Sequence, residues 1–187
     1  YAFSLNIFKP MTHDPLPNRL AALSLALADA QIAAARDATG LSASACAALT
    51  TIAQYPGDSI GALARVLDLT HSVTVRLVDQ LAADGLVTKG PGREDRRAVS
   101  LTLTQAGRTM ADGIRRARAE AVTRALTGLD PAGRGHLAQA VDRVLAAVTT
   151  GRQQADHLCR LCDEQACGGD ACPVECRAVA LETGGGS

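Results

Sequence analysis

Five of the six cysteines lie in one short stretch near the C-terminal end of the chain. Four thiolates in so short a stretch suit tetrahedral zinc, and Gly168-Gly169 permits a tight turn between the last two of them. The sequence therefore predicts a zinc site, with Cys176 or His157 as substitute ligands. The four predicted ligands follow the spacing Cys159-x2-Cys162-x4-Cys167-x4-Cys172.

Two other kinds of chemistry fit the same cysteines. An iron–sulfur cluster is the main alternative, because Cys172-Pro173 resembles the Cys-Pro ending of bacterial ferredoxin motifs, although the longer gaps fit that template poorly. A thiol–disulfide switch is the third interpretation. The sixth cysteine, Cys46, stands apart from the cluster, and we expect it to be a small core residue.

A second group of chemically interesting residues is an arginine-rich turn between two short strand patterns. The strands are expected at 86–89 and 99–103, where Val99, Leu101 and Leu103 alternate with polar residues. Arginines on a protruding hairpin suit the narrow minor groove of DNA, where the potential is most negative. Asp95 is expected to orient a neighbouring arginine, because phosphates repel a carboxylate. The predicted DNA-contacting arginines of the turn are Arg93, Arg96 and Arg97.

Two short helices must precede and position this hairpin. Ser59 is expected to cap the first, whose apolar residues 60, 63, 64 and 67 share one face. Thr70 is expected to cap the second, and Gly85 to end it. The predicted inward stripe of the second helix is Val73, Leu77 and Leu81, which leaves His71, Ser72, Val75, Arg76 and Asp79 facing outward.

Two helices joined by a tight turn and followed by a hairpin describe a winged helix-turn-helix. In this arrangement the second helix lies in the major groove of double-stranded DNA. Arg76 suits a guanine edge or a phosphate, and Val75 suits a thymine methyl group. His71 and Ser72 lie in the first turn, where free backbone N–H groups also bind phosphate.

The rest of the sequence has helical periodicity, so the predicted fold class is mainly α with a small β-wing. Long apolar stripes at 17–37 and beyond Thr104 exceed what the winged lobe covers, which predicts a homodimer with half-sites about 10 bp apart. Residues 1–10 precede Met11 as a vector-derived or read-through segment. The expected domains are 11–40 (dimerisation helix), 41–104 (winged helix-turn-helix), 105–151 (dimerisation helices) and 152–187 (cysteine-rich tail with a disordered end).

Composition excludes several other functions. The net charge is zero, but residues 60–118 hold 10 basic and 6 acidic residues, a local +4, whereas residues 152–187 hold 3 and 6, a local −3. Aromatic residues make up 2% of the chain, which argues against sugar sites and single-strand nucleic-acid platforms. The sequence contains no recognisable set of catalytic residues, so we do not expect the protein to be an enzyme. The sequence shows no membrane span and no signal peptide, so we expect a cytoplasmic protein without a membrane partner.

The segments 84–87 and 95–104, followed by Gly107, resemble the MarR family of bacterial transcriptional regulators. The resemblance covers about residues 17–150. It implies an obligate homodimer that represses nearby genes and releases DNA when a small ligand or an oxidant acts. It also implies that Asp95 and Arg97 form the acid–base pair of the wing. The alternative function is a metal- or redox-sensing winged-helix module that binds a protein partner rather than DNA.

Overall fold

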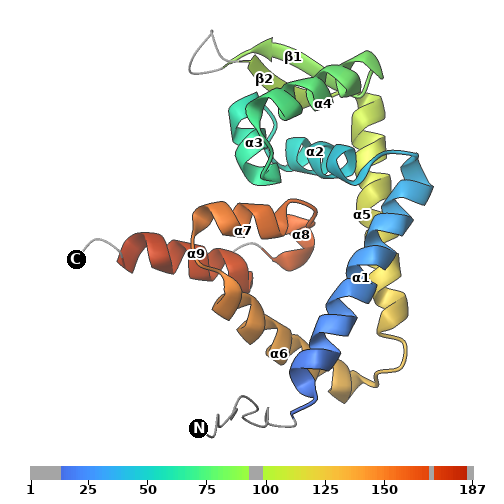
Figure 1. Cartoon of the computed structure of the whole chain (residues 1–187), viewed down its shortest axis with the longest axis vertical. Helices are drawn as coiled ribbons and strands as arrows, with labels where there is room; N and C mark the ends of the chain where they lie inside the picture. The colour runs from blue at the N-terminus through green and yellow to red at the C-terminus, as the bar shows by residue number, and fades with distance from the viewer. Residues whose placement is uncertain (1–13, 93–98, 169–170, 185–187) are drawn as a thin grey trace, which may run out of the picture.

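The computed structural model describes residues 14–92, 99–168 and 171–184, apart from the side chain of residue 165. Two long helices, α1 (Leu16–Thr39) and α5 (Gln105–Ala125), lie side by side and carry a lobe at one end (Figure 1). The lobe contains α2 (Ala43–Gln54), α3 (Ile60–Leu67), α4 (His71–Ala83) and a two-stranded sheet. From the other end, α6 (Pro131–Val148) leads to a tail of three further helices that lies beneath the lobe.

The helix starts predicted at Ser59 and Thr70 are confirmed. The side chains of Ser42, Ser59, Thr70, Thr104 and Asp130 each accept a backbone N–H from the first turn of the helix that follows. Such caps satisfy N–H groups that have no partner within the helix. The helix ends are confirmed at Gly40 and Gly85, which adopt left-handed φ values of 72° and 71°.

The sheet is the predicted hairpin. Strand β1 (Val87–Pro91) pairs antiparallel with β2 (Val99–Leu103), and Lys89 faces Leu101 across the pair. Leu101 and Leu103 are buried, whereas Val99 is exposed near the tip. The loop between α2 and α3 is tied to this sheet, because the N–H of Leu101 donates to the carbonyl of Asp58 at 2.9 Å.

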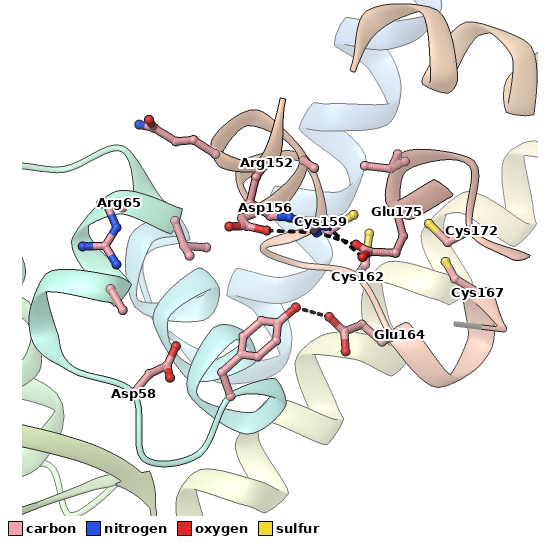
Figure 2. Close-up of a pocket in the computed structure, with 16 residues that line it drawn as sticks. Asp58, Arg65, Arg152, Asp156, Cys159, Cys162, Glu164, Cys167, Cys172 and Glu175 are labelled. Carbon is pink, nitrogen blue, oxygen red and sulfur yellow. Dashed lines mark hydrogen bonds and ion pairs between the residues drawn. The ribbon is translucent and has the colours of Figure 1, made fainter. Parts of the chain in front are cut away.

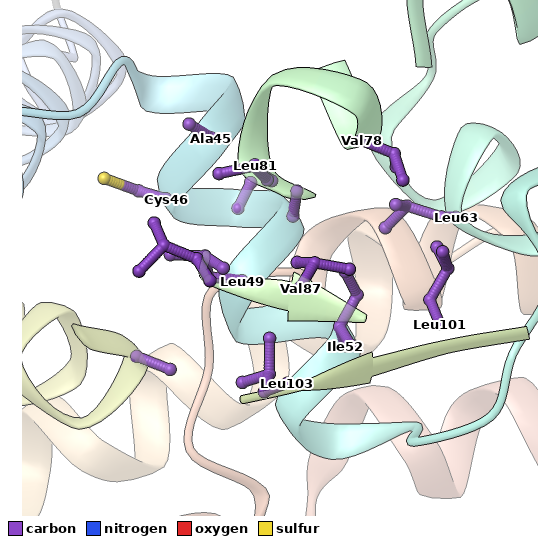
Figure 3. Packing of buried hydrophobic residues seen from close by; sticks show 14 of the residues in the cluster. Ala45, Cys46, Leu49, Ile52, Leu63, Val78, Leu81, Val87, Leu101 and Leu103 are labelled. Carbon is purple, nitrogen blue, oxygen red and sulfur yellow. The ribbon is translucent and has the colours of Figure 1, made fainter. Parts of the chain in front are cut away.

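The main hydrophobic core lies within the lobe and at its junction with α5 (Figure 3). Its members are aliphatic, as the low aromatic content of the chain requires. The expectation that Cys46 is a core residue is confirmed, since it is 2% exposed. The largest fully buried side chains are Leu49, Leu63, Val78, Leu81, Leu101, Ile114, Thr50 and Thr74 in this region, and Thr149 in the tail region.

The predicted inward stripe of α4 is partly wrong. Leu81 is buried, but Val73 is 45% exposed and Leu77 only half-buried. The buried positions are instead Thr74, Val78 and Leu81. Thr74 tolerates burial because its hydroxyl donates to the carbonyl of Thr70 at 3.0 Å, which satisfies the polar group locally.

A close backbone approach holds α5 against the start of the sheet. A Cβ atom added at Gly107 would lie 2.0 Å from the carbonyl oxygen of Leu86. The hydroxyl of Thr104 donates to the carbonyl of Gly85 at 2.8 Å in the same region. Only glycine allows the first turn of α5 to lie so near the end of α4.

The tail is more ordered than predicted. The segment expected only as a cysteine-rich tail folds into α7 (Arg152–Cys159), α8 (Glu164–Cys167) and α9 (Pro173–Gly184). Gly151 occupies the N-cap position of α7. The tail has its own small apolar cluster, which contains Ala155, Val174 and Ala178. The expected disordered end and residues 1–10 lie outside the described residues, except that Gly184 ends α9.

A network of charges fastens α9 to α7. The guanidinium of Arg152 donates to Glu175 at 2.6 and 3.0 Å and to Glu182 at 2.9 and 3.1 Å. The two carboxylates are half-exposed, so the network fixes geometry more than it adds stability. Within the described ranges, no helix combines the length and the apolar character needed to cross a membrane.

Candidate DNA-binding surface and cysteine cavity

The N-terminal half of α4 presents a polar surface to solvent. His71, Ser72 and Arg76 are exposed, as predicted. The hydroxyls of Thr70 and Ser72 lie 3.3 Å apart at the start of the helix. This end of α4 therefore carries side-chain donors beside the free N–H groups of a helix N-terminus, a combination suited to phosphate and base edges.

Two predicted outward residues of α4 are less available than expected. Val75 is half-buried and packs against the core, whereas its neighbour Val73 is exposed. Asp79 forms an ion pair with Lys89 of β1. The structure thus adds Val73 and Lys89 to the exposed face of α4 and the adjoining hairpin. Neither was predicted, although strand alternation in 86–89 could have indicated Lys89.

The predicted residues of the wing lie outside the described residues. These are Arg93, Asp95, Arg96 and Arg97. The strands that lead to them are described, and the Asp79–Lys89 pair places β1 directly against α4. The hairpin therefore starts beside the exposed face of α4 (Figure 1).

The predicted metal ligands line a cavity of about 770 Å³ between the tail and the lobe (Figure 2). The lobe contributes the end of α2 and one face of α3, including Tyr55, Asp58 and Arg65. The tail contributes α7, α8 and the start of α9. The four cysteines on the tail wall are Cys159, Cys162, Cys167 and Cys172.

The four thiols form two pairs. Cys159 and Cys162 share a hydrogen bond, which is the main reason that the pKa of Cys162 is lowered and that of Cys159 is raised. The positive charge of Arg118 also lowers the pKa of Cys162. In the second pair, burial is the main cause that raises the pKa of Cys167, and a contact with Cys172 adds to it.

The arrangement of these sulfur atoms is open. In the part of the chain that the structure describes, no group of three His, Cys, Asp or Glu side chains is placed so that it could hold a metal ion. Four carboxylates, those of Asp58, Asp156, Glu164 and Glu175, line the same cavity. The described geometry is that of two thiol pairs along one wall.

The proposed substitute ligands lie elsewhere. The Nδ1 of His157 is 2.9 Å from the carbonyl oxygen of Val66, so it donates a hydrogen bond that fastens α7 to α3. Neither His157 nor Cys176 is among the residues that line the cavity. Burial raises the pKa of Cys46, which lies in the core.

The segment between α7 and α8 contacts the lobe directly. Tyr55 donates to the Glu164 carboxylate, and Gln54 donates to the carbonyl of Cys162. Leu161 packs against the main core, and the guanidinium of Arg118 donates to its carbonyl. The cysteine-bearing segment is therefore held by both α2 and α5.

Comparisons with known proteins agree with this geometry. Residues 39–98 match the family model described as the MarR family. No curated protein sequence matches the chain significantly. The fold is similar to that of Rv1404 from Mycobacterium tuberculosis, with a TM-score of 0.66 and 21% identity over 76% of this chain and 99% of that chain.

Two further solved structures share the fold. CouR from Rhodococcus jostii RHA1, solved with p-coumaroyl-CoA bound, is 22% identical over 73% of this chain and 94% of its own, with a TM-score of 0.56. Wild-type MarR from E. coli, in its apo form, is 18% identical over 67% and 96%, with a TM-score of 0.57.

The family consists of transcriptional regulators that typically bind DNA and respond to ligands, and that are not enzymes. The matched residues begin at the end of α1 and include α2, α3, α4 and β1. This region thus matches the MarR family model, and its observed fold is a winged helix-turn-helix.

Proposed function

We propose that the protein is a repressor that binds a palindromic DNA site as a homodimer. The observation that carries the proposal is the exposed face of α4, with His71, Ser72 and Arg76, at the outer end of the lobe beside the strands of the wing. A helix presented in this way fits the major groove. Arg76 would contact a guanine edge or a phosphate, and His71 and Ser72 would contact phosphates.

Lys89 adds a positive charge at the base of the wing. It is paired with Asp79. When DNA is bound, its ammonium group would bind a phosphate in place of some of its contact with the Asp79 carboxylate. Arg93, Arg96 and Arg97 would extend the contact into the minor groove, with Asp95 orienting them.

Exposed apolar residues support the homodimer. Large aliphatic side chains on α1 and α6 are 42–67% exposed in the single chain. Full burial of such a side chain contributes about 1.5–3 kcal/mol, so a second copy that covers both helices would be strongly favoured. The residues concerned are Leu16, Leu20, Leu23, Leu25 and Ile32 on α1, and Val141, Val144 and Val148 on α6.

Release of DNA would follow from a change in the spacing of the two α4 helices. A small ligand, a change in bound metal or oxidation of the thiols would favour a dimer with the wrong spacing and thereby lower its affinity for DNA. The cavity between lobe and tail is of the size that small ligands occupy.

The test is a fluorescence-anisotropy titration of duplex DNA from the region beside the protein's own gene, at several salt concentrations. Arg76→Ala should weaken binding about tenfold and reduce the salt slope by about one. The matched control is Arg177→Ala, which removes an exposed arginine on α9 and should leave both unchanged. Footprinting should show two half-sites about 10 bp apart.

Two results would contradict the proposal. One is a stable single-chain species in sedimentation at the concentrations used for binding. The other is DNA affinity that neither Arg76→Ala nor Arg97→Ala alters. Binding that is absent for DNA at low salt but present for a protein partner would favour the alternative function of a protein-binding module.

A further inference from the structure

We propose that Cys159, Cys162, Cys167 and Cys172 bind one zinc ion as four thiolates, and that this ion locks the tail onto the helix-turn-helix of the same chain. The proposal concerns a site distinct from the DNA-contacting face and does not depend on DNA binding. Its starting point is that the fold brings these four side chains to one cavity wall (Figure 2).

The fold selects four of the six cysteines. Cys46 is enclosed in the main core, and Cys176 does not line the cavity. The four that remain come from three places, namely the end of α7, the end of α8 and the residue before α9. Four thiolates are a complete ligand set for a structural zinc site, which needs no water and no carboxylate.

Each thiol pair supplies two ligands, so an ion bound by both pairs would have four. Cys159 contacts Cys162, and Cys167 contacts Cys172. The sulfur atoms of both pairs gather at one end of the cavity in Figure 2. Because no three of the described side chains could hold a metal ion as they are placed, zinc binding would require the second pair to move toward the first.

The chain around the second pair permits this movement. Cys167 is exposed and ends a helix of four residues, and Gly168 after it has a φ of 75°, in the left-handed region that glycine adopts without strain. The first pair is fixed, because α7 packs against α3 and the backbone of Cys162 accepts a hydrogen bond from Gln54. Zinc binding would therefore move α8, which ends at Cys167, toward the fixed Cys159–Cys162 pair.

Charge around the first pair suits such a centre. Zinc with four thiolates carries a net charge of about −2. The guanidinium of Arg118 donates to the carbonyl of Leu161, next to Cys162, and Arg152 and Arg65 line the cavity. The carboxylates of Asp156 and Glu175 face Arg152, to which both are paired. The guanidinium of Arg118 therefore offsets part of the thiolate charge, whereas Arg152 is already neutralised by its carboxylate partners.

The coupling to the lobe follows from the contacts of residues 160–164, which lie within the first pair and directly after it. Leu161 packs against the core, and Glu164 accepts from Tyr55. Thr51 donates to the carbonyl of Arg160 at 3.3 Å. An ion bound by Cys159, Cys162 and Cys167 would therefore also fix residues 160–164, which contact α2.

The first experiment measures metal in the full-length protein purified without oxygen. We expect about one zinc per chain and no iron. Cys162→Ser and Cys167→Ser should each lose most of the zinc, whereas Cys46→Ser and Cys176→Ser should retain it. Cobalt added to the metal-free protein should give the intense thiolate-to-metal absorption of a four-sulfur site, and this absorption should be lost in the first two variants only.

A second experiment tests the lock without relying on variants. Hydrogen exchange of residues 160–164 and of α3 should be slower with zinc than after chelation. Iron with acid-labile sulfide in place of zinc would overturn the assignment of the metal. Two disulfides without metal, or zinc retained in all four variants, would overturn the site, and equal exchange rates with and without zinc would overturn the lock.

Discussion

The hydroxyl of Tyr55, at the end of α2, donates a hydrogen bond to the carboxylate of Glu164, the first residue of α8. The two residues are 109 positions apart in the sequence, so this bond joins the winged helix-turn-helix lobe to the tail. Burial raises the pKa of Tyr55, and the acceptor Glu164 raises it further. The phenol therefore stays protonated and continues to donate throughout the neutral and mildly alkaline range.

Removal of this hydroxyl should loosen the contact between lobe and tail. We expect Tyr55→Phe to lower the free energy of unfolding by about 1 kcal/mol, because it removes a hydrogen bond and keeps the ring. Amide exchange at residues 160–164 should become faster. Glu164→Gln is the matched control, since its amide oxygen still accepts from Tyr55. Equal acceleration in the two variants would show that the charge of Glu164 matters and the bond does not.

Thiol reactivity in the reduced, metal-free protein should differ between the two pairs. The pKa of Cys162 is lowered by its hydrogen bond with Cys159, whereas burial raises the pKa of Cys167. A lower pKa means that the thiolate persists to lower pH, so Cys162 should be alkylated by iodoacetamide at a lower pH than Cys167. Mass spectrometry of timed reactions between pH 6 and 9 measures this order, which about equal rates at neutral pH would refute.

A pair of glycines in α5 should respond in opposite ways to the same substitution. Gly107→Ala should lower the free energy of unfolding by about 2 kcal/mol or more, because its Cβ would collide with the carbonyl of Leu86. Gly113→Ala meets nothing within 4 Å and should raise that free energy by about 0.5–1 kcal/mol. Urea denaturation followed by circular dichroism measures both, and a stable Gly107→Ala variant would show that α5 does not approach the sheet so closely.

The orientation of α4 can be tested with two valines. Val78 is fully buried and Val73 is 45% exposed. Val78→Ala should therefore lower the free energy of unfolding by about 2 kcal/mol, and Val73→Ala by less than about 0.5 kcal/mol. The reverse order in urea denaturation would restore the orientation expected from the sequence, with Val73 inward.

Helix starts and ends could be predicted because their causes are local. Ser59 and Thr70 each cap a helix whose first N–H groups lie within three residues, and Gly85 adopts its left-handed conformation regardless of distant contacts. The orientation of α4 depends on which side the rest of the lobe covers. Val73 and Val78 are both apolar, so the pattern alone does not say which is buried.

The contacts of the tail could not be predicted for a related reason. Its spacing of cysteines indicated a shared site, and the structure places the four predicted ligands on one cavity wall. The lobe residues that hydrogen-bond to the tail, Tyr55 and Gln54, lie more than 100 residues away in sequence. Neither has a type or a spacing that points to the tail. The helices α7 and α9 were missed because their apolar residues are few and small.

The route of the chain around the lobe limits how the lobe can turn. The chain leaves the lobe through α5, runs out through α6 and comes back to press α7 against α3. The lobe is thus fastened at two separate points rather than hanging from one hinge. Two attachments restrict rotation of the lobe to the axis that joins them. The helix α4 can therefore change its direction only by rotation of the lobe about that axis.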